Sequence, residues 1–201
     1  MRKLVEKRLL VATHNAGKLD EMRALFTPYG IEVVGAGEMG LAEPDETEDS
    51  FLGNARIKAR AAVEATGLPA LADDSGICVD ALGGAPGVYT ADWAETGAGR
   101  DFGMAMERTW AELEAVNAPM PRRAQFRCTL VLAWPDGHEE VFEGVLPGQV
   151  VWPPQGAQGH GYDPIFQPDG HEVTLGVMSP EEKNRISHRA LAFAELEKAL
   201  A

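Results

Sequence analysis

The stretch VATHNAGKLDEM near the amino terminus brings a hydroxyl, an amide and an ammonium to the start of an expected helix. These groups belong to Thr13, Asn15 and Lys18, and the backbone N–H groups at a helix start are unsatisfied donors. Such a turn suits phosphate oxygens. It is not the Walker phosphate loop, because Ala12 and Leu19 fail at the two ends of that motif. The alternative is an ordinary N-capped turn.

Two adjacent carboxylates, Asp73 and Asp74, follow a predicted short strand in ADDSG. Ligands of α/β sheets bind at the carboxyl ends of strands. Neighbouring side chains of a strand point to opposite faces, so we expect one of the two to enter a binding site. That carboxylate can bind Mg²⁺ or orient an attacking water, while the other caps a turn or supports the site. A turn with hydrogen-bonding duties alone is the alternative.

The acidic run EPDETEDS is predicted to be a loop between two elements. Most such runs are only solvated. Mg²⁺ bound together with a triphosphate, however, needs only one or two protein carboxylates. The loop can therefore supply a second carboxylate to a metal.

Cationic side chains gather in the last quarter of the chain. Tyr162 and Asp163 precede a proline bend in HGYDPIF, and the segment EEKNRISHR then sets basic residues along a helix start and its continuation: Lys183, Arg185, His188 and Arg189. An anionic ligand needs such a cationic focus in an acidic protein. Surface basic residues of a helix are more often simply solvated.

Strand and helix patterns that could position these residues alternate along the chain. The expected strands are Leu9 to Ala12, Ile31 to Val34, two pieces either side of a turn at Asp73 to Gly76, and a hairpin of Gln125 to Ala133 with Glu140 to Val145. Helices are expected after the first strand, from Phe51 to Gly67, from Arg100 to Val116, and after Ser179, which heads a capping box. This order predicts an α/β fold with a mixed sheet.

Composition limits the possible partners. The chain has 201 residues and a formal net charge of −13, which argues against a nucleic-acid backbone or an anionic membrane as the main partner. One domain is the expectation at this length. The apolar run near the amino terminus is too short for a signal peptide, so we expect a cytoplasmic protein. Cys78 and Cys128 lie alone in apolar segments and are expected to be buried, reduced thiols.

Taken together, five blocks resemble one family: THNAGKLDE, NARIKA, LADDSGICVDALGGAPGVY, GYDPIF and EEKNRISHRA. Their order resembles the inosine triphosphate pyrophosphatase family, which removes non-standard purine nucleotides. The resemblance implies one pyrophosphatase domain over residues 1–201, with an elongated mixed central sheet flanked by helices and an active-site cleft between two lobes. It also implies a homodimer and Mg²⁺-dependent hydrolysis of a purine nucleoside triphosphate to the monophosphate and pyrophosphate.

The resemblance also carries roles onto individual residues. The triphosphate would be contacted by Lys183 and by the turn residues Thr13, His14, Asn15, Ala16, Gly17 and Lys18. Asp74 would be the catalytic residue and a metal ligand, with Ser75 beside it at the reacting centre and Asp73 able to share its role. Asp45 would be the second metal ligand, with Glu46 as the alternative. The nucleoside would be bound by His160, Gly161, Tyr162, Asp163, His188 and Arg189.

Three positions depart from the family pattern. Gly53 stands where Glu is common and Asp92 where Arg is common, which affects metal or phosphate contacts. His160 replaces the usual Phe, which affects stacking on the base. Two other functions stay open on these residues: a pyrophosphatase for modified pyrimidine or methylated nucleotides, and a nucleotide-binding regulator without hydrolysis.

Overall fold

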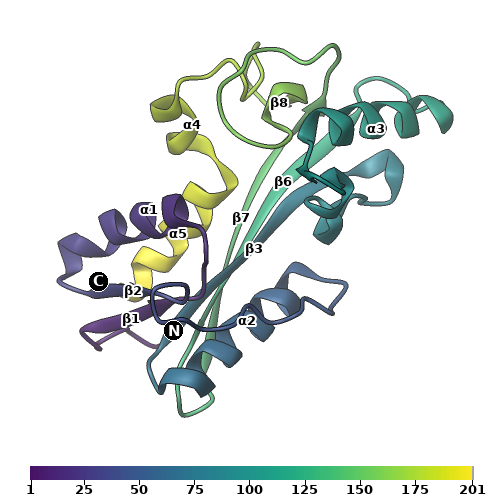
Figure 1. The fold of residues 1–201 in the computed structure, drawn as a ribbon. Helices are drawn as coiled ribbons and strands as arrows, with labels where there is room; N and C mark the ends of the chain where they lie inside the picture. Colours follow the sequence, from purple (N-terminus) through teal and green to yellow (C-terminus); the bar gives the residue numbers. More distant parts are fainter. Residues whose placement is uncertain (201) are drawn as a thin grey trace. The chain divides into compact units, whose positions relative to one another are not determined.

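The chain folds as a mixed α/β protein in the computed structural model, which describes residues 1–200. Six strands form one sheet in the order β2-β1-β3-β6-β7-β8 (Figure 1). β1 pairs in parallel with β2 and β3, whereas β7 and β8 are antiparallel. The predicted fold class, α/β with a mixed sheet, is confirmed.

The strands are β1 (Arg8–Val11), β2 (Glu32–Gly35), β3 (Ala70–Val79), β4 (Glu95–Thr96), β5 (Gly99–Arg100), β6 (Arg123–Ala133), β7 (Glu139–Val150) and β8 (Phe166–Pro168). The helices are α1 (Ala16–Phe26), α2 (Phe51–Thr66), α3 (Phe102–Ala115), α4 (Pro180–Ile186) and α5 (His188–Leu200). Short 3-10 helices are η1 (Thr27–Tyr29), η2 (Asp80–Leu82), η3 (Gly87–Tyr89), η4 (Asp92–Ala94) and η5 (Asp163–Ile165).

The chain divides into two compact units. Unit 1 contains Met1–Asp74, Thr129–Glu143 and the segment from Ala192 onward, and unit 2 contains Ser75–Cys128 and Gly144–Leu191. The boundary falls inside β3, between Asp74 and Ser75, so the two residues predicted at the reacting centre are consecutive in the chain but belong to different units.

In unit 1, small residues let helices approach the sheet closely. The alanines of α2, Ala55 and Ala59, pack on Ala72 of β3 and Val131 of β6. On α1, Leu19 lies so close to β2 that a Cβ built at Gly35 would be 2.5 Å from its Cδ2 atom. Figure 1 shows α1 and α2 on opposite sides of the sheet.

Unit 2 has its own apolar core, built around aromatic side chains. Phe126 of β6 packs edge-to-face on Phe166 of β8, with ring centroids 4.7 Å apart. Tyr162 and Leu113 of α3 are buried in the same cluster. This core fixes the loop before η5 and the start of α4, which carry the predicted nucleoside-binding residues.

Two strands of the structure are longer than predicted. The turn predicted at Asp73 to Gly76 is wrong, because β3 runs without interruption from Ala70 to Val79. The predicted strand ending at Val145 also continues, since β7 extends to Val150. Gly148 allows this extension, because a Cβ there would lie 2.4 Å from the carbonyl oxygen of Gln167 on β8.

The capping box predicted at Ser179 is confirmed, and it starts α4. The helix does not continue unbroken, because Ser187 has extended backbone angles and separates α4 from α5. Ser187 Oγ then accepts the N–H of Ala190 and caps the new helix. Cys78 and Cys128 are both free thiols; Cys128 is buried as expected, but Cys78 is only half-buried. Within residues 1–200, no helix has both the length and the apolar character that crossing a bilayer requires.

Candidate active site

The turn between β1 and α1 is ordered by its own side chains. Asn15 is the N-cap of α1 and its Oδ1 accepts the N–H of Lys18 at 3.1 Å. Thr13 Oγ1 accepts the N–H of Asn15 at 3.2 Å, and His14 Nε2 lies 2.8 Å from the carbonyl oxygen of Leu41. The first N–H groups of a helix lack acceptors within that helix. The positive end of α1 is thus held at the carboxyl end of β1, where an anion can bind.

Lys18 extends from this turn to β3. Its Nζ donates to Asp73 Oδ2 at 2.8 Å, and the Asp73 carboxylate is largely shielded from solvent. Of the two adjacent aspartates, Asp73 is therefore the partner of Lys18. This pairing separates its role from that of Asp74.

Asp74 faces a second lysine, Lys58 of α2. The Lys58 Nζ atom lies 2.5 Å from Glu46 Oε1 and 3.8 Å from Asp74 Oδ1. One ammonium thus holds two carboxylates that come from the acidic loop and from β3. The two carboxylates converge on a single cation in unit 1.

Burial and neighbouring charge set the pKa values of this pair. Burial raises the pKa of Asp74 from 3.8 to about 6, and Glu46 adds to the rise, while Lys58 opposes it. Burial works to lower the pKa of Lys58, but the nearby carboxylates outweigh it and the pKa is raised. Lys58 is therefore charged at neutral pH, and Asp74 becomes ionised only as the pH approaches neutrality.

Asn54 connects Asp74 to the acidic loop. Its side chain is buried, its Oδ1 accepts the N–H of Glu48 at 3.0 Å, and its amide hydrogen-bonds the Asp74 carboxylate. Sequence reasoning assigned no role to Asn54 or to Lys58. Both lie in the NARIKA block, four residues apart on α2, and this helical spacing on one face was the available signal.

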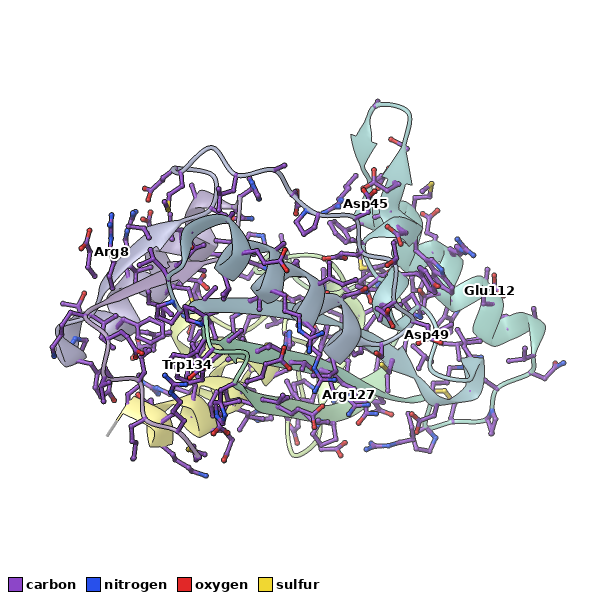
Figure 2. The ribbon with its side chains drawn as sticks, turned by 90° about the horizontal axis from the view of Figure 1, so that it is seen from below. Arg8, Asp45, Asp49, Glu112, Arg127 and Trp134 are labelled. Carbon is purple, nitrogen blue, oxygen red and sulfur yellow. The ribbon has the colours of Figure 1, made fainter. Side chains whose placement is uncertain are left out.

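The acidic loop meets the site through Glu46 rather than Asp45. Figure 2 shows Asp45 and Asp49 on the segment that leads to α2. Asp45 and Glu46 are both exposed, but Glu46 binds Lys58 and contributes to the raised pKa of Asp74. Glu46 thus shares the Lys58 ammonium with Asp74.

Gly53, the first departure from the family pattern, leaves room for this loop. A Cβ at Gly53 would lie 2.5 Å from the Cβ of Glu48 and 3.0 Å from Ser50 Oγ. The Glu48 side chain fills the space that a side chain at position 53 would need. The acidic loop therefore closes on α2 because residue 53 is glycine. Asp92, the second departure, is exposed in η4.

The raised pKa of Asp74 predicts a change of stability with pH. The folded-state pKa lies above the unfolded value, so ionisation of Asp74 destabilises the folded protein as the pH rises through about 6. In a chelator-containing buffer, wild type should lose about 1 kcal/mol relative to Asp74→Asn between pH 5 and pH 8, because about one pKa unit of the shift lies above pH 5 and one unit corresponds to about 1.4 kcal/mol. Denaturant unfolding of both proteins at the two pH values measures this difference.

Asp169→Asn is the matched control for that measurement. A hydrogen bond from Arg123 lowers the pKa of Asp169, so this carboxylate is ionised at pH 5 and at pH 8. Its effect on stability should therefore be the same at both pH values. If the difference in unfolding free energy between wild type and Asp74→Asn were also the same at both pH values, ionisation of Asp74 would not destabilise the folded protein.

In unit 2 the side chain of Tyr162 belongs to the core. Only 1% of the residue is exposed, its hydroxyl donates to the carbonyl of Thr90 at 3.1 Å, and burial raises its pKa to about 12. Its ring packs edge-to-face on Phe102. The Tyr162 ring therefore serves the core of unit 2.

Asp163 and Lys183 form an ion pair in unit 2. Asp163 is buried, and its Oδ2 accepts both the Lys183 Nζ and the backbone N–H of His160. The His160 side chain is exposed and available to a ligand, and Gly161 follows with a φ of 66°.

His188 and Arg189 open α5 after the break at Ser187. The His188 ring is buried and stacks on Phe126 with centroids 4.9 Å apart. Arg189 is half-buried in the same first turn. Ser75 is half-buried and directly follows Asp74 on β3.

The structure thus brings the predicted residues together in two groups. Unit 1 gathers the turn between β1 and α1, Asp73, Asp74 and Glu46 around two lysines, Lys18 and Lys58, of which Lys58 was not predicted. Unit 2 gathers His160, Asp163 and Lys183 in direct contact. Within residues 1–200, no three or more His, Cys, Asp or Glu side chains come together in a group that could hold a metal ion by protein ligands alone.

Comparisons with known proteins agree with this arrangement. A family model described as the Ham1 family matches residues 9–199. A dITP/XTP pyrophosphatase from Ruegeria pomeroyi is 68% identical over 190 residues, covering 94% of this chain and 93% of that protein.

Solved structures show the same likeness. A HAM1 protein from Coxiella burnetii has a TM-score of 0.91 at 36% identity, covering 97% of this chain and 98% of that chain. A nucleoside-triphosphatase / dITP/XTP pyrophosphatase from Mycobacterium abscessus has a TM-score of 0.80 at 41% identity, covering 94% of this chain and 98% of that chain. The match extends over nearly the whole chain and confirms the resemblance of the sequence blocks: this chain belongs to the Ham1 family.

Proposed function

We propose that this protein hydrolyses inosine, deoxyinosine and xanthosine triphosphates to the monophosphate and pyrophosphate, and so removes non-standard purines from the nucleotide pool. The observation that carries the proposal is the Lys58 ammonium held between Asp74 and Glu46, beside the Lys18 and Asp73 pair. Phosphoryl transfer requires cations to neutralise phosphate charge and a carboxylate to orient the nucleophile. The names of the relatives, dITP/XTP pyrophosphatase, supply the substrate class.

The triphosphate is assigned to unit 1. Its oxygens would accept hydrogen bonds from the turn Thr13 to Lys18, where the start of α1 supplies N–H groups and a positive dipole end. Lys18 and Lys58 add charge-assisted hydrogen bonds, which are stronger than neutral ones. Binding exchanges their carboxylate partners for phosphates.

The same group fits a divalent cation. Asp74 and Glu46 already converge on one cation, the Lys58 ammonium, and carboxylate oxygens are the ligands that Mg²⁺ prefers. Asp74 with Glu46, or with Asp45, would hold Mg²⁺ together with the substrate phosphates. When bound, the ion neutralises phosphate charge and orients the phosphates.

Asp74 is assigned to the attacking water. Its carboxylate, made more basic by burial, accepts the proton of a water directed at the α-phosphorus, and Asn54 fixes its orientation. Pyrophosphate is the leaving group, and Lys18 and Lys58 stabilise the charge that develops on it. Ser75 lies next to Asp74 along β3.

Unit 2 is assigned to the nucleoside. Because Tyr162 is buried, the contacts would come from the backbone of Gly161 and from the side chains of His160 and Arg189. His188 would hold the start of α5 against Phe126. The Lys183 charge is balanced by Asp163, so Lys183 offers its remaining N–H donors rather than a surplus charge.

We also assign the protein to the cytoplasm, where the nucleotide pool lies, and to a homodimer, as the family resemblance implies. Sedimentation of the purified protein tests the dimer. A mass of about 43 kDa, twice that of the 21.6 kDa chain, is expected, and a monomer would contradict it.

The identity of the released phosphate tests the reaction. Inosine triphosphate with Mg²⁺ should yield pyrophosphate and inosine monophosphate, and a chelator should abolish turnover. Orthophosphate with inosine diphosphate would instead show cleavage at the γ-phosphate. Tight binding without either product would favour the non-hydrolysing regulator.

A further inference from the structure

Asp163 is a buried carboxylate of unit 2, and it forms an ion pair with Lys183. Only 2% of the residue is exposed, and its Oδ2 atom receives two donors, the Lys183 ammonium and the His160 N–H at 2.7 Å. A buried carboxylate requires such donors, because an unsatisfied one is costly. Asp163 therefore links α4 to the loop that precedes η5.

Gly159 encloses the same carboxylate from the loop side. A Cβ at Gly159 would lie 2.0 Å from Asp163 Oδ2, and the residue has a φ of 79°. No side chain fits between this backbone and the carboxylate. The loop passes directly over Asp163 and leaves it no space for a ligand on that side.

Backbone hydrogen bonds fasten the rest of the loop. Gln155 N donates to the carbonyl of Pro164 at 2.7 Å, and Gln158 N donates to the carbonyl of Gly176 at 2.8 Å. Gly176 N in turn donates to the carbonyl of Asp163 at 3.0 Å. The conformation of residues 155–162 thus depends on contacts made at Asp163 and Gly176.

We infer that Asp163 is a positioning residue: it anchors the His160 loop and aims Lys183, and it does not itself touch the nucleoside. The inference rests on the proposed function and changes the role of Asp163 within it. A direct contact would require carboxylate surface that Gly159, His160 and Lys183 already cover. The loop and Lys183 should consequently respond together whenever this anchor is disturbed.

Gly159→Ala tests the anchor without altering the chemistry of Asp163 or Lys183. Its Cβ should displace the loop from the carboxylate, so we expect KM for inosine triphosphate to rise about fivefold or more while kcat stays within about twofold. Amide hydrogen exchange in residues 155–162 should become faster. A change in folding alone would not separate KM from kcat in this way.

Gly170→Ala is the matched control. Gly170 has a φ of 78°, nearly that of Gly159, but a Cβ there would meet no atom within 4 Å. The backbone strain of the two variants is therefore alike, and only Gly159→Ala meets Asp163. We expect Gly170→Ala to retain wild-type KM and wild-type exchange in residues 155–162.

A double variant completes the test. If Asp163 acts through the loop and Lys183, Gly159→Ala combined with Asp163→Asn should be no worse than the more severe single variant, within about twofold. Multiplicative effects on KM would assign Asp163 a separate contact with the nucleoside and overturn the inference. Unchanged exchange and KM in Gly159→Ala would do the same. If wild type fails to hydrolyse inosine triphosphate, the proposed function fails, and the exchange comparison still decides whether Asp163 anchors the loop.

Discussion

Asp74→Asn should lower kcat for inosine triphosphate hydrolysis by about a hundredfold or more, the range of general base catalysis. The amide keeps the shape of the carboxylate and can still pair with Asn54, but it cannot accept a proton. Steady-state kinetics with Mg²⁺ measure the loss, and a denaturant unfolding curve confirms that the variant is folded.

Asp73→Asn is the matched comparison, because it changes the neighbouring carboxylate in the same strand. Asp73 binds Lys18 at 2.8 Å, so its loss should disturb the placement of that lysine and raise KM more than it lowers kcat. If Asp73→Asn abolished turnover while Asp74→Asn retained it, the roles of the two aspartates would have to be exchanged.

Lys58→Met should lower kcat/KM for the same substrate by about a hundredfold or more. Removing one positioned donor to developing charge costs about that factor in other enzymes, and this ammonium is the one that both Asp74 and Glu46 approach. Methionine retains the length and apolar stem of the side chain. Kinetics at several salt concentrations separate a local loss from general screening.

Arg60→Met is the control for Lys58→Met on the same helix. Arg60 is exposed and its guanidinium binds Glu139 on β7, away from Asp74. The Arg60→Met variant should keep kcat/KM within about twofold of the wild-type value. Equal losses in the two variants would mean that α2 had been disturbed as a whole, and the role of Lys58 would be rejected.

Local sequence signals were sufficient to predict several elements of this fold. The Asn15 turn and the Ser179 capping box are decided by hydrogen bonds between near neighbours, and both are present as expected. The alternation of strands and helices likewise predicted the mixed α/β sheet. These features depend on a few consecutive residues.

The continuous strand β3 could not be predicted in this way. Two aspartates and a glycine favour a turn locally, but the partners of those aspartates, Lys18 and Lys58, come from helices far away in the sequence. Tertiary ion pairs stabilise a strand that local preference disfavours. The same ion pairs show that Asp73 pairs with Lys18 and Asp74 with Lys58.

Burial explains why the structure differs from the prediction at the expected nucleoside site. Tyr162 and Asp163 stand in one motif, and the motif alone indicates contact with a ligand. The packing of unit 2 instead places the Tyr162 ring in the core and the Asp163 carboxylate beneath Gly159. A motif identifies residues that matter, but only the fold shows which side chains are free to bind.

Comparison of kcat/KM for inosine, xanthosine, adenosine and guanosine triphosphates is the most direct test of the central claim. A 6-oxo purine offers an acceptor where adenine offers an amino donor, so a donor of unit 2 would pair with the former and be left unsatisfied by the latter, at a cost of about 1–3 kcal/mol. Guanosine triphosphate has the 6-oxo group too, so it must be excluded at its 2-amino position. We expect inosine and xanthosine triphosphates to exceed both standard purines by about tenfold or more. Ratios within about fivefold, a difference of about 1 kcal/mol, would contradict a base-selective pyrophosphatase.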